Sequence, residues 1–260
     1  MEPQLRQAVA DGVATVVIDH PAKRNAMTAD MWRALPPLLG ALAVDPAVRA
    51  LVLTGAGDTF CAGADISSLR TEPGRAQELA GRAEEALAAF PKPTLAAVRG
   101  YCVGGGCQLA AACDLRFADQ DATFAITPAK LGIVYPASTT RRLVALVGPS
   151  TAKYLLFSGE PVDAARALRR GLVDEVLAAG ELDARVKEFT RVLASRSLLT
   201  QAAAKEFATD VGSLGAGTGA AGAAREAYWA GQMRDSGDTA EGVAAFLERR
   251  RPRFTWTPPR

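Results

Sequence analysis

The sequence predicts an α/β fold with a mostly parallel sheet, followed by a mainly helical C-terminal region. Short apolar runs bounded by turn residues have the composition of buried strands, and helical patterns lie between them. After about residue 138 the strand signal nearly disappears. Strands that alternate with helices favour right-handed crossovers between parallel neighbours. The predicted strands span residues 13–18, 50–53, 94–98 and 115–118.

The predicted helices have recognisable ends. Thr28 can cap a helix that starts at the next residue, although Pro36 and Pro37 should shorten, kink or restart that helix. An amphipathic pattern over residues 75–90 stops before two prolines. The glycine- and alanine-rich residues 212–222 predict a flexible connection before two closing helices. Further helices are predicted over residues 141–147, 150–157, 164–170, 182–195, 199–208, 223–234 and 239–250.

Composition and charge exclude several classes of protein. The 260 residues carry 30 Lys and Arg against 28 Asp and Glu, and this net charge of +2 is far from the dense positive surface of a nucleic-acid-binding domain. No run of about 18 uninterrupted apolar residues occurs, so we expect no membrane span. Residues 1–14 lack a basic flank, an apolar run and a cleavage site. We therefore expect a cytoplasmic protein.

Few side chains are suited to metal binding or to activating a nucleophile. His20 is the only histidine, which excludes the usual zinc hydrolase site and restricts any serine triad to one imidazole. Its position before Pro21, at the apparent end of a strand, favours a turn residue over a catalytic base. The four cysteines form no CxxC pair, and we expect free thiols in the core. We predict no metal site.

Two glycine-rich loops are the strongest functional feature of the sequence. Residues 54–66 and 100–110 each follow a predicted strand and lead into a helix. Glycine lets backbone approach a ligand closely, and a helix start aims unpaired N–H groups at the space in front of it. Two such loops can hold one oxyanion, such as that of a thioester enolate.

Two other interpretations of these loops remain open. The glycines can serve only tight packing between strand and helix. Binding of a dinucleotide is a weaker alternative, because neither loop has the GxGxxG order with an acidic residue about 20 positions further on.

Three motifs in and before these loops resemble those of the crotonase superfamily, the enoyl-CoA hydratase/isomerase family. They are the sequences PAKRNA at residues 21–26, FCAGADI at residues 60–66 and GYCVGGGCQLA at residues 100–110. Similarity continues through residues 165–174 and 241–250, so it covers nearly the whole chain. The resemblance implies a crotonase-like spiral of ββα units for residues 1–195. It also implies a helical trimerisation or lid region for residues 196–260.

The resemblance assigns roles to backbone groups of both loops. The N–H groups of Ala64 and Gly105 would form an oxyanion hole around a thioester oxygen. The carbonyl of Ala62 would accept a hydrogen bond from the adenine amino group of coenzyme A. Coenzyme A would therefore belong to an acyl-CoA substrate, and no separate cofactor is expected.

Further residues of the same motifs match positions near coenzyme A. Lys23 and Arg24 correspond to a turn near its phosphates, where two cations suit the charge, although such a pair is also common on a solvated surface. Asp65 is interpreted as a helix N-cap in preference to a catalyst. The remaining positions in this group are Ala26 and Ile66.

The sequence departs from the hydratase pattern at both catalytic glutamates. Gln108 and Pro128 stand at the matching positions. A glutamine amide does not act as a general base at neutral pH, and proline has no polar side-chain group. The reaction type is therefore open among hydration, isomerisation and decarboxylation. A non-catalytic member that binds CoA is a further alternative.

Residues 124–135 instead resemble the subgroup that contains methylmalonyl-CoA decarboxylase, with Tyr135 at the position of an active-site tyrosine. Decarboxylation needs no base, because cleavage of the C–C bond itself generates the enolate. Tyr135 would orient the carboxylate or return a proton, unless it only packs over a pocket as a rim residue. The match is partial, because decarboxylases of that type carry histidine at the position of Ala64.

The resemblance also implies the partners of the chain. We expect an acyl-CoA as the small-molecule substrate and a homotrimer or dimer of trimers as the assembly. A short basic tail favours nucleic-acid binding only weakly, because the overall charge is near neutral. We therefore expect no nucleic acid and no membrane as partners. The basic residues of the tail are Arg249, Arg250, Arg251 and Arg253.

Overall fold

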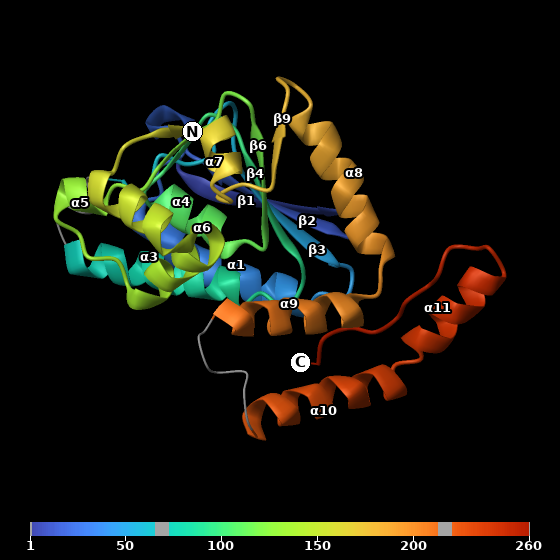
Figure 1. The fold of residues 1–260 in the computed structure, drawn as a ribbon. Coiled ribbons are helices and arrows are strands. Elements are labelled where there is room, and N and C mark those ends of the chain that lie inside the picture. Colours follow the sequence, from blue (N-terminus) through green and yellow to red (C-terminus); the bar gives the residue numbers. More distant parts are fainter. Residues whose placement is uncertain (1, 66–72, 213–219, 260) are drawn as a thin grey trace.

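A mostly parallel six-stranded sheet lies at the centre of the computed structural model, which describes residues 2–65, 73–212 and 220–259 (Figure 1). The strand order is β1-β2-β3-β4-β6-β9. Strands β1 and β2 are antiparallel, and the other neighbours are parallel. The strands are β1 (Gln4–Ala10), β2 (Val13–Asp19), β3 (Ala50–Gly55), β4 (Thr94–Val98), β6 (Leu115–Asp119) and β9 (Glu175–Leu177).

The four predicted strands are confirmed as β2, β3, β4 and β6, whereas β1 was not predicted. All but one residue of β1 are exposed, so the strand lacks the apolar run that identifies a buried one. Its pairing with β2 depends on the turn at Asp11 and Gly12, which have φ of 52° and 80°. An Asp-Gly pair with positive φ at both residues is a common tight hairpin turn.

A second, three-stranded sheet contains β5 (Tyr101–Val103), which lies within the glycine-rich residues 100–110 and follows β4 of the main sheet. The sheet has the order β5-β7-β8, with β7 (Thr123–Ala125) and β8 (Val162–Asp163). Gly100, with φ of 50°, separates β4 from β5, and a Cβ at this position would lie 2.3 Å from the carbonyl oxygen of Asp58. The units β4-β5-α4 and β6-β7-α5 thus repeat the predicted ββα arrangement.

Helices cover both faces of the main sheet (Figure 1). Alternate residues of β3 face opposite sides: Leu51 and Leu53 belong to the main core, whereas Val52 packs in a second cluster with Val186 of α8. None of the helices in the described ranges is long and apolar enough to cross a membrane. The described helices from the N-terminus to residue 195 are η1 (Pro21–Lys23), α1 (Ala29–Val44), α3 (Pro73–Ala88), α4 (Gly105–Ala112), α5 (Pro128–Leu131), α6 (Ala137–Ser158), α7 (Ala164–Arg169) and α8 (Leu182–Ser195).

Helix α1 begins as predicted, but it neither ends nor restarts at Pro36 and Pro37. Thr28 Oγ1 accepts the Met31 N–H at 3.2 Å. The predicted shortening or restart is therefore wrong. The buried face of α1 offsets the two missing backbone hydrogen bonds, because tertiary packing supplies most of the stability of a protein helix. That face consists of Met31, Trp32, Leu35, Leu39 and Leu42.

Three C-terminal helices extend beyond the sheet (Figure 1). They are α9 (Leu198–Gly212), α10 (Ala220–Asp235) and α11 (Asp238–Leu247). A small apolar cluster apart from the main core links α9, Trp229 and Trp256. The division at residue 195 into a core and a trimerisation or lid region stays a prediction. The predicted flexible connection falls largely on residues 213–219, outside the described residues.

Gly106 allows α4 to pack against the first glycine loop. A Cβ at Gly106 would lie 2.3 Å from the carbonyl oxygen of Cys61, so Gly106→Ala should lower the free energy of unfolding by about 2 kcal/mol or more. Gly40 of α1 has no atom within 4 Å of its Cβ position, so Gly40→Ala should raise that free energy by about 0.5–1 kcal/mol. Urea unfolding followed by circular dichroism measures both changes. Equal effects at the two sites would contradict this packing.

Candidate active site

Two backbone hydrogen bonds hold the glycine-rich loops side by side. Cys61 N–H donates to the carbonyl of Tyr101, and Val103 N–H donates to the carbonyl of Cys61, each at 2.9 Å. Burial raises the pKa of the Cys61 thiol to about 12, and this thiol is therefore neutral and unreactive at physiological pH. All four cysteines are buried and free, as predicted.

The Ala64 and Gly105 N–H groups lie close together and have no acceptor among the described residues. Met27 N–H donates to the carbonyl of Gly63, and Asp65 N–H donates to the carbonyl of Met27. In this parallel pairing the intervening Ala64 N–H points away from Met27. No carbonyl of the described residues accepts a hydrogen bond from Ala64 or Gly105. A Cβ at Gly105 would lie 3.5 Å from Ala64 N, so the two amides are neighbours.

A cavity of about 220 Å³ lies in front of these two amides. Gly105 is the first residue of α4, so the partial positive charge of that helix end faces the cavity. Among the described residues that line it, none is acidic or basic. The arrangement suits an oxygen that carries partial negative charge. The polar side chains of its wall are those of Trp32, Gln77, Gln108, Thr127 and Tyr135.

The turn at residues 21–26 lies beside the first loop. Ala62 N–H donates to the carbonyl of Arg24 at 3.0 Å, and Lys23 Nζ lies 2.7 Å from Asp65 Oδ2. The Arg24 guanidinium stacks 4.9 Å from the centre of the Tyr101 ring. Ala26 is buried. The structure thus brings together five of the six predicted coenzyme A residues, while Ile66 and any helix that Asp65 caps fall outside the described residues.

Asn25 is a structural residue of this turn that the sequence reasoning missed. It is fully buried with φ of 58°, and its side-chain amide donates to the carbonyls of Ala56 and Thr59 at 2.8 and 2.6 Å. Its Oδ1 accepts the backbone N–H of His20. The His20 ring contacts the carbonyl of Ala26 at 2.8 Å, in agreement with the predicted turn role. Asparagine tolerates positive φ, and this preference is the sequence feature that could have indicated the turn role of Asn25.

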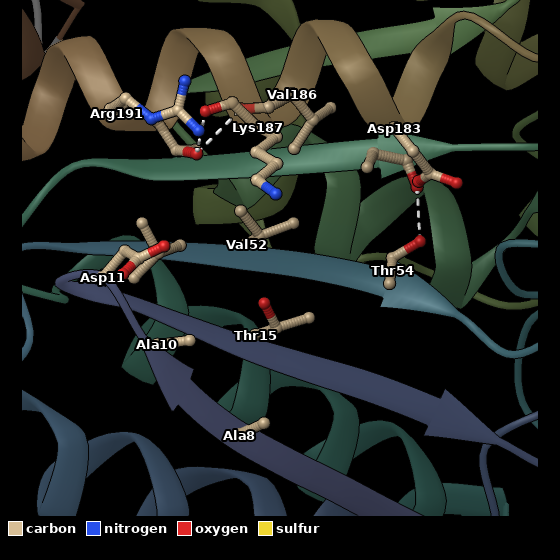
Figure 2. Close-up of a pocket in the computed structure, with 13 residues that line it drawn as sticks. Ala8, Ala10, Asp11, Thr15, Val52, Thr54, Asp183, Val186, Lys187 and Arg191 are labelled. Carbon is tan, nitrogen blue, oxygen red and sulfur yellow. Dashed lines mark hydrogen bonds between the residues drawn. The ribbon is translucent and has the colours of Figure 1, made fainter.

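A larger groove lies on the opposite face of the sheet. It has a volume of about 330 Å³ and runs between strands β1 to β4 and α8, with Lys187 and Arg191 of α8 above Thr15 and Val52 (Figure 2). The Thr54 hydroxyl donates to a strand carbonyl at 2.9 Å. Thr54, the first residue of the 54–66 loop, is the one described residue of either glycine-rich loop that lines this groove. The chemistry of the walls, rather than volume, therefore identifies the smaller cavity as the candidate site.

Comparison with known proteins identifies the family of the chain. Residues 8–257 match the sequence pattern of the enoyl-CoA hydratase/isomerase family. The chain belongs to that family. A crotonyl-CoA hydratase of Syntrophomonas wolfei is 36% identical over 252 residues, which cover 93% of this chain and 94% of the relative.

Solved structures of the family share the fold. One enoyl-CoA hydratase/isomerase family member is 40% identical with a TM-score of 0.89, and the match covers 99% of this chain and 100% of that chain. An enoyl-CoA hydratase of Mycobacterium smegmatis is 32% identical with a TM-score of 0.86, covering 98% and 100%. The predicted family and the crotonase-like α/β fold class are confirmed.

The two positions predicted to match the family's glutamates line the cavity with non-acidic side chains. Gln108 lies on α4, one turn after Gly105, and is 5% exposed. Pro128 is the buried first residue of α5. Both line the cavity. The described part of the wall therefore has no carboxylate that could act as a general base.

Tyr135 enters the cavity wall from the segment between α5 and α6. Burial raises the pKa of Tyr135 above its ordinary value, with smaller contributions from Cys107 and Glu84, so the phenol remains a proton donor. Glu84 lies behind the wall, where its carboxylate accepts the Thr139 hydroxyl at 2.5 Å and pairs with Arg142. Burial raises the pKa of Glu84.

Proposed function

We propose that this chain is an acyl-CoA enzyme that stabilises a thioester enolate with the N–H groups of Ala64 and Gly105. The proposal depends on two neighbouring amides that face one uncharged cavity and have no acceptor among the described residues. A thioester oxygen becomes negative when a bond at its α-carbon breaks, and fixed donors stabilise that charge. Each donor would contribute about 3 kcal/mol.

The turn beside the first loop supports a coenzyme A site outside the cavity. Lys23 and Arg24 are exposed cations that suit phosphate groups, and the ion pair with Asp65 orients the Lys23 side chain. No N–H of the described residues donates to the carbonyl of Ala62, which leaves it able to accept the adenine amino group. Ala26 would form the buried side of the same turn. Coenzyme A is then part of the substrate, and no separate cofactor is proposed.

Decarboxylation of a malonyl-type ester is the reaction that the uncharged wall favours over hydration. Hydration and isomerisation need a base, and Gln108 and Pro128 supply none. In decarboxylation the bond between the α-carbon and the carboxylate breaks, its electron pair forms the enolate, and CO2 leaves. A proton then returns to the α-carbon, and Tyr135 is the donor that we propose. A non-catalytic CoA-binding protein, in which the same two amides would only hold the thioester carbonyl, is the alternative.

Deuterium incorporation tests the enolate. The chain, incubated in heavy water with enoyl-, saturated and malonyl-type CoA esters, should place deuterium at the α-carbon of at least one, as read by mass spectrometry. Gly105→Pro removes one donor at a helix position that tolerates proline and should reduce the rate by about 100-fold or more. Gly105→Ala adds the same Cβ, 3.0 Å from Trp32, but keeps the N–H. Equal rates for these two variants would rule out the oxyanion hole.

Release of CO2 tests the role of Tyr135. Tyr135→Phe should lower kcat for a malonyl-type ester by about 100-fold with little change in KM, because proton return is lost and binding is kept. Tyr154→Phe is the matched control, since the Tyr154 hydroxyl is bonded to Glu160 and does not line the cavity. The raised pKa of Tyr135 predicts no loss of rate from its ionisation through pH 9. An unchanged kcat in Tyr135→Phe would assign proton return to another group.

The C-terminal helices are proposed to form the contacts of a homotrimer or dimer of trimers. Phe246 and Leu247 of α11 are 83% and 74% exposed, which is unusual for large apolar side chains. Light scattering should give three or six times the chain mass of 27.1 kDa. Phe246→Asp should lower that mass, whereas Val44→Asp, at an exposed position on α1, should not. A monomeric wild-type chain would exclude the assembly.

A further inference from the structure

Three buried N–H donors in the cavity wall have no hydrogen-bond acceptor in the described part of the chain. They are Trp32 Nε1, Gln77 Nε2 and Gln108 Nε2, from helices α1, α3 and α4. Trp32 is 2% exposed and Gln108 is 5% exposed. Buried donors in folded proteins are nearly always paired, so three orphan donors around one cavity indicate a ligand that supplies acceptors.

The indole of Trp32 shows that the ligand must supply a hydrogen-bond acceptor. A glutamine amide can present either a donor or an acceptor, whereas an indole nitrogen only donates. A Cβ at Gly105 would lie 3.0 Å from Trp32 Cζ2, which is on the same edge of the indole as Nε1. The Trp32 N–H edge therefore lies against the second glycine loop. Its acceptor must be close to the thioester rather than at the end of a long acyl chain.

The number of donors indicates more than one acceptor oxygen. A carbonyl oxygen accepts about two hydrogen bonds, and the amides of Ala64 and Gly105 already suffice for the thioester oxygen. The three orphan donors match the two oxygens of a carboxylate, which accept up to about four hydrogen bonds.

The charge of the wall permits an anion. The described lining residues include no carboxylate, and Glu84, whose charge reaches Tyr135, is engaged by Arg142 and Thr139. Glutamates at positions 108 and 128 would repel a negatively charged acyl group. Gln108 and Pro128 therefore have a shared consequence: they remove the base of a hydratase and make the cavity compatible with an anion.

We infer that the acyl group taken by this cavity carries a carboxylate near the thioester, which accepts hydrogen bonds from Trp32, Gln77 and Gln108. The inference rests on the proposed function, because it assigns the acyl group of the CoA ester. Neutral donors at fixed positions replace the water lost by the anion, which is the condition for burying a charge. Trp32, Gln77 and Gln108 are specificity-determining residues on this account.

Three CoA esters of similar size test the inference by their dissociation constants. Malonyl-, acetoacetyl- and isovaleryl-CoA share one skeleton, and their third acyl carbon carries two oxygens, one oxygen and one methyl, or two methyls. Calorimetry should show malonyl-CoA binding about tenfold or more tightly than isovaleryl-CoA, with acetoacetyl-CoA weaker than malonyl-CoA. Turnover of malonyl-CoA is followed in parallel through CO2.

Variants that replace one donor side chain by an apolar one show whether the donors in the cavity wall cause the preference. Trp32→Phe and Gln108→Met should each weaken malonyl-CoA about tenfold and leave isovaleryl-CoA within about twofold. Trp229→Phe is the matched control, because it makes the same chemical change on α10, outside the cavity. It should change neither constant.

The outcomes separate this inference from the proposed function. If isovaleryl- or acetoacetyl-CoA binds as tightly as malonyl-CoA, or if Trp32→Phe behaves like Trp229→Phe, the carboxylate is wrong while the CoA site stands. If no CoA ester binds, the proposed function fails and the inference fails with it.

Discussion

The contact between Gly106 and the carbonyl of Cys61 is the constraint on which the candidate site depends. A side chain at Gly106 would meet that oxygen at 2.3 Å, so only glycine lets α4 approach the first loop this closely. The hydrogen bonds between Cys61, Tyr101 and Val103 set the register of the two loops. Because of this approach, the Ala64 and Gly105 amides face one cavity. Two segments that are distant in sequence thus become one set of donors.

The other end of α4 is held by a buried cation. Arg116 of β6 donates to the carbonyl of Cys113 at 2.8 Å and, at 3.4 Å, to that of Ala110, where the helix end carries partial negative charge. It also pairs with Asp174 at 3.1 Å. With both ends fixed, the α4 N-terminus has little freedom to reorient when charge develops on a ligand. That rigidity is what makes hydrogen-bond donors effective in catalysis.

The sequence predicted those parts of the molecule whose structure is determined by residues that are neighbours in the chain. Buried parallel strands are apolar runs, and glycines at close approaches stand out as motifs. The uninterrupted α1 was mispredicted because its stability comes from a buried face rather than from local propensity at Pro36 and Pro37. Trp32 and Gln77 gave no signal, since one resembles an ordinary core residue and the other an ordinary surface residue. Only the fold shows that both reach the same cavity.

The polarisation of a bound thioester carbonyl tests the central claim most directly. Raman difference spectroscopy of an acyl-CoA ester with and without a ¹³C-labelled carbonyl isolates the stretching frequency of that bond in the complex. Two hydrogen bonds from Ala64 and Gly105 predict a shift to lower frequency than in water, and a smaller shift in Gly105→Pro than in Gly105→Ala. A bound ester whose carbonyl frequency is unchanged from water would contradict the oxyanion hole.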